Sequence, residues 1–300
     1  MKYGIPDNIY AVLLAFAILT ACEKVDSQEP TLQEGSRYLF TAQIVSDTKA
    51  SLEPSKWLNK YKTRWSEMDA IILKDATDPR RPGERCYVTQ GAGTSTGIFG
   101  ASLESSSYYA IFASSSYLYD DGQDYIYVPS IQYHHNIRRD IYADSTESDN
   151  KVFLSRDYPM AAKSNTRKLK FYNLCSILKF SVTGNGEYLQ SILVKSNDGE
   201  LLSGAGVLDL SGRKPVMTLS GMSGIGGSTE LLYKVEQELT SDPLDCYIIL
   251  PSQDYDKGFT IELHTDTGWM DVVTKTKITL DQSEMFEIKE PVQYVAERDV

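Results

Sequence analysis

Histidine is the side chain most often used for acid–base catalysis and for zinc binding, and this chain contains three: His134, His135 and His264. Neighbouring residues on a strand point to opposite faces, so His134 and His135 cannot easily bind one ion together. We therefore expect no zinc site and interpret the three histidines as solvated loop residues.

Three other kinds of stretch match parts of known functional motifs. Residues 91–97 are rich in glycine, but they lack the lysine and the following helical pattern that a phosphate-binding loop needs. Residues 222–224 lack the flanking glycines of a nucleophile elbow. Residues 120–124 and 254–258 lack the ligand alternation and distal Glu of a calcium loop, so we interpret both as turns. The sequence thus predicts no catalytic residue, no metal site, no cofactor and no enzymatic activity.

Cys22 is a candidate for covalent modification and not for catalysis or metal binding. It ends the stretch Leu19-Thr20-Ala21-Cys22, which follows an apolar segment over residues 11–19. A short apolar segment followed by small residues is typical of a secretory signal, and it is shorter than the roughly 20 residues of a spanning helix. A Cys at the cleavage position resembles the bacterial lipoprotein signal, which implies acylation of Cys22 after removal of residues 1–21. The alternatives are a plain signal peptide and a buried helix with an incidental Cys.

The other cysteines are Cys86, Cys175 and Cys246. An odd number allows at most one disulfide, and no Cys-x-x-Cys pair is present. Cys175 lies in an apolar run and is interpreted as a buried hydrophobic residue.

Composition limits the classes of partner. The chain has 300 residues, of which 41% are hydrophobic and 24% charged, as in globular proteins. Its net charge of −11 argues against nucleic-acid binding and against a basic membrane-binding patch. Membrane attachment would therefore rest on the lipid.

The elements that must position these residues have the pattern of strands. After a polar, acidic tether over residues 22–35, apolar side chains alternate at Tyr38, Phe40, Ala42 and Ile44. Further strand-like segments, separated by turn signals about every ten residues, lie at 68–73, 86–89, 97–100, 108–113, 125–128, 188–195, 201–210, 246–250, 259–264, 274–280 and 285–288. A short helix is possible over residues 54–61. This pattern predicts an all-β chain with two tandem β-sandwich domains, over residues 36–165 and 166–300.

Two local features carry specific expectations. Residues 169–182 form the longest apolar-rich run of the mature chain, and we expect one core strand there, with a bulge near Asn173. A helix over the middle of this run is the alternative. Asn197-Asp198-Gly199 predicts a hairpin between the strands on either side of it.

The 20 tyrosines include clusters at Tyr108-Tyr109, Tyr117–Tyr119 and Tyr125–Tyr127. Tyrosine suits both core packing and binding surfaces. We favour core packing, and the alternative is a platform on which Tyr108 and Tyr117 stack against sugars.

Several short motifs occur in a fixed order over nearly the whole mature chain. In the first half they are Trp65-x-x-Met68-Asp69-Ala70-Ile71, Tyr87, Gly97-Ile98-Phe99, Tyr108-Tyr109-Ala110-Ile111-Phe112, Tyr127-Val128-Pro129 and Pro159-Met160-Ala161-Ala162. In the second half they are Leu169-x-Phe171-x-Asn173-Leu174-Cys175-Ser176-Ile177-Leu178-Lys179-Phe180, Leu202-Ser203-Gly204 and Ile249-Leu250-Pro251. In this order and spacing the chain resembles the fimbrillin-like surface lipoproteins of Bacteroidales, the family of type V pilus subunits.

This resemblance implies two transthyretin-like β-sandwich domains and a lipoprotein of the outer membrane or of a fimbrium. It also implies that a trypsin-like protease removes the first strand, so that a neighbouring subunit's strand can fill the groove. The removable strand would contain Tyr38, Phe40, Ala42 and Ile44. The candidate cleavage residues are Arg64, Lys62 and Lys60, and ordinary solvated loop charges are the alternative reading of all three.

The expected partners are other fimbrial subunits, the membrane through the lipid anchor, and a host or bacterial surface receptor or glycan. The C-terminal tail, in which Val292, Tyr294 and Ala296 alternate, could donate a strand or merely close the sheet. The alternative function is that of a monomeric glycan-binding surface lipoprotein.

Overall fold

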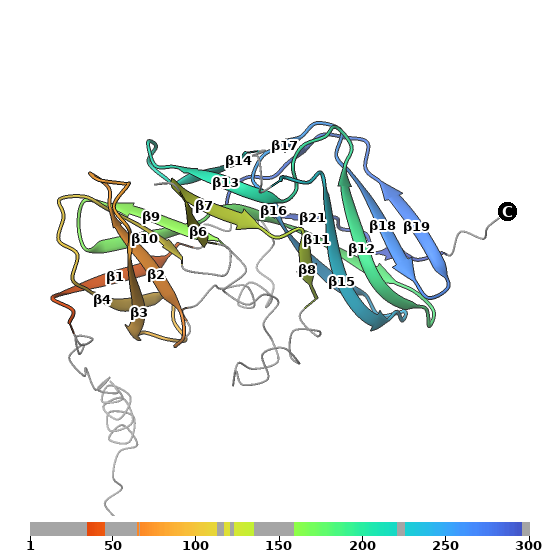
Figure 1. Cartoon of the computed structure of the whole chain (residues 1–300). Coiled ribbons are helices and arrows are strands. Elements are labelled where there is room, and N and C mark those ends of the chain that lie inside the picture. The colour runs from red at the N-terminus through yellow and green to blue at the C-terminus, as the bar shows by residue number, and fades with distance from the viewer. Residues whose placement is uncertain are drawn as a thin grey trace, which may run out of the picture. The chain divides into compact units, whose positions relative to one another are not determined.

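A computed structural model of the chain describes residues 35–45, 65, 67–112, 117–120, 123–134, 159–220 and 226–295. Figure 1 shows these residues as strands joined by turns, and they contain no helix. This confirms the all-β prediction. The division into two transthyretin-like sandwiches after a signal peptide stays a prediction, and the helix considered for residues 54–61 lies outside the described residues.

Seven strands form a closed barrel in the order β1-β10-β9-β5-β2-β3-β4. They are β1 (Tyr38–Ile44), β2 (Ala70–Asp75), β3 (Glu84–Gln90), β4 (Thr96–Ala101), β5 (Tyr108–Phe112), β9 (Met160–Ser164) and β10 (Lys168–Asn173). Aromatic side chains fill the interior, where Trp65 packs edge to face on Phe99 and Phe171 with ring centroids 5.0 and 5.3 Å away. Edge-to-face contacts add to the energy of burial because each ring has a negative face and a positive edge.

Two further sheets enclose a second hydrophobic core. One sheet has the order β19-β18-β12-β15-β8, with β8 (Ile131–Tyr133), β12 (Tyr188–Ser196), β15 (Glu230–Glu238), β18 (Phe259–Thr265) and β19 (Gly268–Val273). The other has the order β16-β11-β21, with β11 (Cys175–Thr183), β16 (Leu244–Pro251) and β21 (Met285–Glu287), and β22 (Val292–Gln293) also pairs with β11. Buried and more exposed residues alternate strictly along β18, as expected for a strand with one face on a core.

A third apolar cluster joins the barrel to the rest of the chain. A four-stranded sheet has the order β14-β13-β7-β6, with β6 (Tyr117–Asp120), β7 (Gln123–Val128), β13 (Gly204–Asp209) and β14 (Val216–Leu219). Tyr109 and Ile111 of β5 pack in one cluster with Ile126 of β7 and Ile249 of β16. The remaining strands, β17 (Asp254–Tyr255) and β20 (Ile278–Thr279), pair with each other.

The single strand predicted over residues 169–182 is wrong, because β10 ends at Asn173 and β11 begins at Cys175 in a different sheet. Between them, the amide of Leu174 donates a hydrogen bond to the Pro159 carbonyl at 2.8 Å. Ile177 of β11 faces the third cluster, whereas Leu178 faces the second core. Both faces of β11 are therefore apolar, which explains why the sequence shows no clean alternation there.

The hairpin predicted at Asn197-Asp198-Gly199 is also wrong. The chain does turn here, with Gly199 at a φ of +87°. However, β12 pairs with β15 and β18, whereas β13 pairs with β14 and β7. An Asp-Gly turn signals a reversal of direction, but the tertiary partners decide whether the flanking strands pair.

Other boundaries differ more modestly. The strand expected at 274–280 is reduced to Ile278–Thr279, and β15 and β19 were not predicted. The domain boundary predicted between residues 165 and 166 falls in the turn joining β9 and β10, which pair with each other in the barrel. The hairpin predicted around residues 120–122 is confirmed, because β6, which ends at Asp120, pairs in antiparallel orientation with β7, which begins at Gln123.

Candidate functional site

The first strand of the barrel is held on both edges. β1 pairs with β4 in antiparallel orientation and with β10 in parallel orientation. Phe40, Ala42 and Ile44 point into the barrel core and are at most 4% exposed, while Tyr38 is partly buried against the same core. Full burial of a Phe or Ile side chain stabilises by about 1.5–3 kcal/mol, so this face supplies much of the barrel's cohesion. A barrel without β1 would have two unpaired strand edges and an apolar groove.

Contacts at the start of β1 fix its register. The Tyr38 hydroxyl donates a hydrogen bond to the Glu104 carboxylate at 2.7 Å. The Arg167 guanidinium lies 3.9 Å from the centroid of the Tyr38 ring, within cation–π distance. The hydrogen bond to Glu104 is the main cause that raises the pKa of Tyr38. Both contacts are exposed and position the strand more than they stabilise it.

Trp65 connects β1 to the segment that follows it in the sequence. Its side chain is 1% exposed, and its indole Nε1 donates a hydrogen bond to the Ala42 carbonyl at 3.1 Å. Its backbone amide donates to the Thr94 carbonyl at 2.9 Å, and its carbonyl accepts from the Gly93 amide at 2.7 Å. Trp65 is therefore anchored independently of the strand whose carbonyl it binds.

The sequence-predicted site residues fall into two groups. Tyr38, Phe40, Ala42 and Ile44 lie together on the core-facing side of β1. Cys22, Lys60, Lys62 and Arg64 lie outside the described residues. Trp65 belongs to a sequence motif, but nothing in its local pattern indicates its contact with β1.

Tyr108 is 3% exposed and packs inside the barrel, so it cannot stack on a sugar from solution. The alternative in which Tyr108 stacks on a sugar is therefore wrong. Successive residues of β5 face two different cores, so its tyrosines are buried on both faces of the strand. Tyr109 and Tyr125 are likewise buried. The side chain of Tyr117 lies outside the described part of the chain.

The histidines differ in part from the sequence-based interpretation. His134 is fully buried, with its ring 6.2 Å from that of Tyr233 in an edge-to-face contact, so its interpretation as a solvated loop residue is wrong. His135 lies outside the described residues. His264 is partly exposed, and its Nε2 lies 3.4 Å from a Glu262 oxygen.

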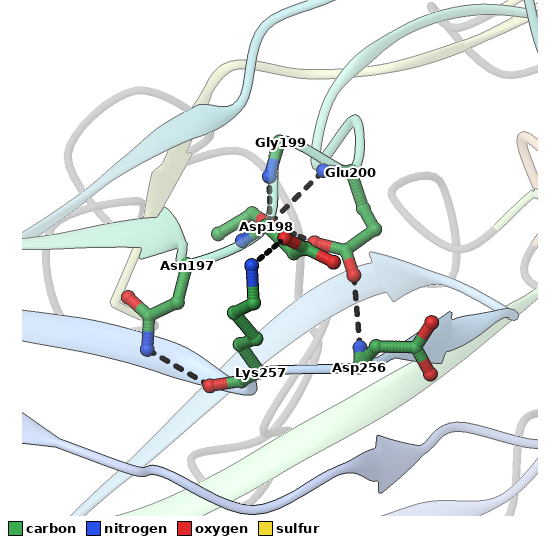
Figure 2. A network of polar contacts seen from close by, with 7 residues as sticks. Asn197, Asp198, Gly199, Glu200, Asp256 and Lys257 are labelled. Atoms are coloured by element: carbon green, nitrogen blue, oxygen red, sulfur yellow. Dashed lines mark hydrogen bonds and ion pairs between the residues drawn. The ribbon is translucent and has the colours of Figure 1, made fainter.

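Residues 254–258, one of the partial calcium motifs, take part in a contact between two turns. Figure 2 shows how the turn after β12 meets the turn between β17 and β18. The Lys257 ammonium pairs with the Asp198 carboxylate, and the Asp256 amide donates a hydrogen bond to Glu200 at 2.8 Å. The side-chain amide of Asn197 donates to the Lys257 carbonyl at 3.0 Å. The polar groups of these two turns thus bind one another. The described residues contain no cluster of three or more metal-ligating side chains.

The environment of Glu200 depends on this contact. Burial raises the pKa of its carboxyl group, but hydrogen bonds from the Ser196 hydroxyl and from the amides of Glu200 and Asp256 outweigh burial and lower it. The carboxylate form is thus the one that joins the two turns.

Within the described residues, no helix is long and apolar enough to cross a membrane. No family model and no curated protein matches the chain.

The structure is similar to several solved structures, all at low sequence identity. One is a candidate cell adhesion protein from Bacteroides uniformis, with 11% identity, a TM-score of 0.42 and coverage of 84% of this chain and 92% of that chain. Another, from Bacteroides ovatus, has 14% identity, a TM-score of 0.43 and coverage of 85% and 95%. The tip fimbrial protein Mfa3 from Porphyromonas gingivalis has 13% identity, a TM-score of 0.34 and coverage of 78% and 80%. The structural neighbours are thus candidate cell adhesion proteins and fimbrial proteins.

Proposed function

We propose that this chain is a non-enzymatic fimbrial subunit or fimbrillin-like adhesin of the bacterial outer membrane. Before cleavage it is anchored through Cys22. Cleavage behind β1 removes this anchor together with the strand, and a strand of another subunit then takes the place of β1. The observation that carries this proposal is the position of β1, inserted between β4 and β10 with three apolar side chains in the core. An incoming strand that repeats the alternation of Phe40, Ala42 and Ile44 would satisfy the same backbone groups and fill the same groove.

Trp65 bears on which bond the protease cuts. A protease needs the residues on both sides of the scissile bond in an extended, accessible form, and Trp65 directly follows Arg64. Trp65 is buried and its amide is hydrogen-bonded, so cleavage after Arg64 requires local opening of the barrel. Cleavage after Lys62 or Lys60 leaves Trp65 in place. We therefore expect Lys60 and Lys62 to be cut faster than Arg64.

Limited trypsin digestion of the purified chain tests the proposal. We expect early cleavage after Lys60 or Lys62, confirmed by N-terminal sequencing, followed by ladders of oligomers that resist SDS. Combined replacement of Lys49, Lys56, Lys60, Lys62 and Arg64 by Ala should abolish the ladders, because no basic residue then remains between β1 and Trp65. The matched control is Arg213→Ala, in the exposed turn at 211–214, which should leave them unchanged. A cut protein that remains monomeric at high concentration would show that β1 is not exchanged.

The membrane anchor is tested separately. Cys22→Ala should release the protein from the outer membrane, because only the lipid is expected to hold so acidic a chain there. Continued membrane association of this variant would rule out Cys22 as the anchor.

A further inference from the structure

The outward face of the five-stranded sheet β19-β18-β12-β15-β8 contains a pocket of about 460 Å³. It lies between β12 and β15, on strands that have no part in the exchange of β1. Its lining residues are Tyr188, Gln190, Ser191, Leu232, Lys234 and Glu236. Its volume lies within the roughly 300–1,000 Å³ of small-molecule sites.

A backbone irregularity builds this pocket. Leu189 pairs with Gln237 and Ser191 with Lys234, so Gln190 alone faces two residues of β15. β12 is also irregular against β18, where Leu189 pairs with Thr265 and Ser191 with His264, so Gln190 is an extra residue on β12. Gln190 and Ser191 therefore both face outward, whereas Leu189 is buried. A regular strand would turn one of the two inward.

Glu236, one of the two β15 residues that face Gln190, has a φ of +52°. Few residues other than glycine adopt this left-handed conformation, and such strained residues cluster at ligand sites. Within the described part of the chain, the side chains of Gln190, Lys234 and Glu236 form no hydrogen bond or ion pair. Their polar atoms are available to a ligand.

Tyr188 supplies an aromatic wall. Its side chain is 41% exposed, and its backbone is held by Asp266 in the turn between β18 and β19. The Tyr188 amide donates to the Asp266 carboxylate at 2.8 Å, and the Asp266 amide donates to the Tyr188 carbonyl at 3.1 Å. The backbone that carries the exposed ring is thus held in place beside the pocket.

We propose that this pocket binds a neutral carbohydrate. Sugar hydroxyls both donate and accept hydrogen bonds, and Lys234, Glu236 and Gln190 together supply donors and acceptors. The positive charge of Lys234 is balanced by Glu236, and the chain carries a net charge of −11, so an anionic ligand is disfavoured. The exposed Tyr188 ring offers a face to the C–H groups of a sugar ring. The proposal does not depend on the exchange of β1.

The test is titration of the full chain with neutral hexasaccharides of glucose, mannose and galactose, and with an acidic hexasaccharide of galacturonate, monitored by NMR and calorimetry. We expect at least one neutral probe to bind with a Kd of about 1 mM or tighter. Tyr188→Ala and Glu236→Ala should each weaken that binding about tenfold or more. The matched control is Tyr87→Ala on β3, because Tyr87 is 43% exposed but belongs to the barrel.

Three outcomes would overturn the inference: no neutral probe binds at about 10 mM, the acidic probe binds best, or Tyr87→Ala weakens binding as much as Tyr188→Ala. Thermal unfolding of each variant checks that it is folded. Should Tyr188→Ala unfold, Gln190→Ala, at an exposed position, takes its place with the same expected loss.

Discussion

The Nζ atom of Lys74 lies 2.9 and 3.0 Å from the two carboxylate oxygens of Asp124, and the Tyr109 hydroxyl donates to the same carboxylate at 2.6 Å. The Lys74 side chain is 0% exposed and that of Asp124 is 7% exposed. These residues come from β2, β5 and β7, so the ion pair joins the barrel to the four-stranded sheet. Loss of one partner would leave the other charge buried without compensation.

We expect Lys74→Met to lower the free energy of unfolding by about 3–5 kcal/mol, measured by urea denaturation. The control is Lys277→Met. Lys277 is 51% exposed and its ammonium lies 2.6 Å from an Asp254 oxygen, so the loss there should be below about 1 kcal/mol. Equal losses in the two variants would contradict a special role for the buried pair.

Glu200 gives a prediction of pH dependence. Its folded-state pKa is lowered from the usual 4.5, so its contribution to stability is fully present above that value and is lost as the pH falls through the lowered folded-state pKa. Glu200→Gln should therefore lower the Tm at pH 6, and the difference from the wild type should shrink as the pH falls below the ordinary pKa of 4.5. A difference in Tm that is constant from pH 6 down to pH 3 would disprove this role.

At the scale of elements, the attachment of β1 depends on a residue outside any strand. Trp65 binds the carbonyl of Ala42 and packs on the rings of Phe99, Phe112 and Phe171. Strand pairing alone would let β1 separate from one edge at a time, whereas the indole ties its middle to the core. Trp65 thus resists the release of β1 that the proposed assembly requires.

Trp65→Phe removes the indole donor and part of the ring, and should destabilise the barrel by about 1–3 kcal/mol. The amides of β1 should exchange with deuterium faster than in the wild type, while those of β18 keep their rates. Trp269→Phe is the matched control, because Trp269 is 44% exposed. Unchanged exchange of β1 in Trp65→Phe would show that the indole does not retain the strand.

At the scale of the whole molecule, three separate cores each bury one thiol. Cys86 lies in the barrel core, Cys175 in the third apolar cluster and Cys246 in the second core. All three thiols are free, so these cysteines form no disulfide with one another. Burial, with a smaller effect of Glu84, raises the pKa of Cys86 to about 12, and burial raises the pKa of the other two thiols.

We expect a Cys22→Ala chain to react with a thiol reagent only after unfolding, when all three thiols become available. A reducing agent should leave its Tm unchanged, because the stability of the described strands depends on no disulfide. Rapid labelling of any thiol in the native state would show that its core opens readily. Mass spectrometry of the labelled peptides identifies the residue.

The sequence by itself determined the all-β class and the positions of many strands, because alternation along a half-buried strand is a local property. Tyr38–Ile44 and Phe259–Thr265 show this alternation and form strands. β15 has the same alternation, with Leu231, Tyr233 and Val235 buried, so its local pattern is sufficient to predict it. The sequence could not place β19 or divide residues 169–182, because the burial of those residues depends on sheets formed by distant segments. β19, for example, lies at a sheet edge, where exposed Trp269 and Val273 obscure the pattern.

Only the tertiary structure decided which side chains meet. It placed Tyr108 inside the barrel and left Tyr188 exposed beside a bulge, although both are tyrosines at strand positions. It also brought Trp65 to the carbonyl of Ala42, 23 residues away. Such contacts depend on register and on which sheet each strand joins, and both are set by long-range packing that no local pattern records.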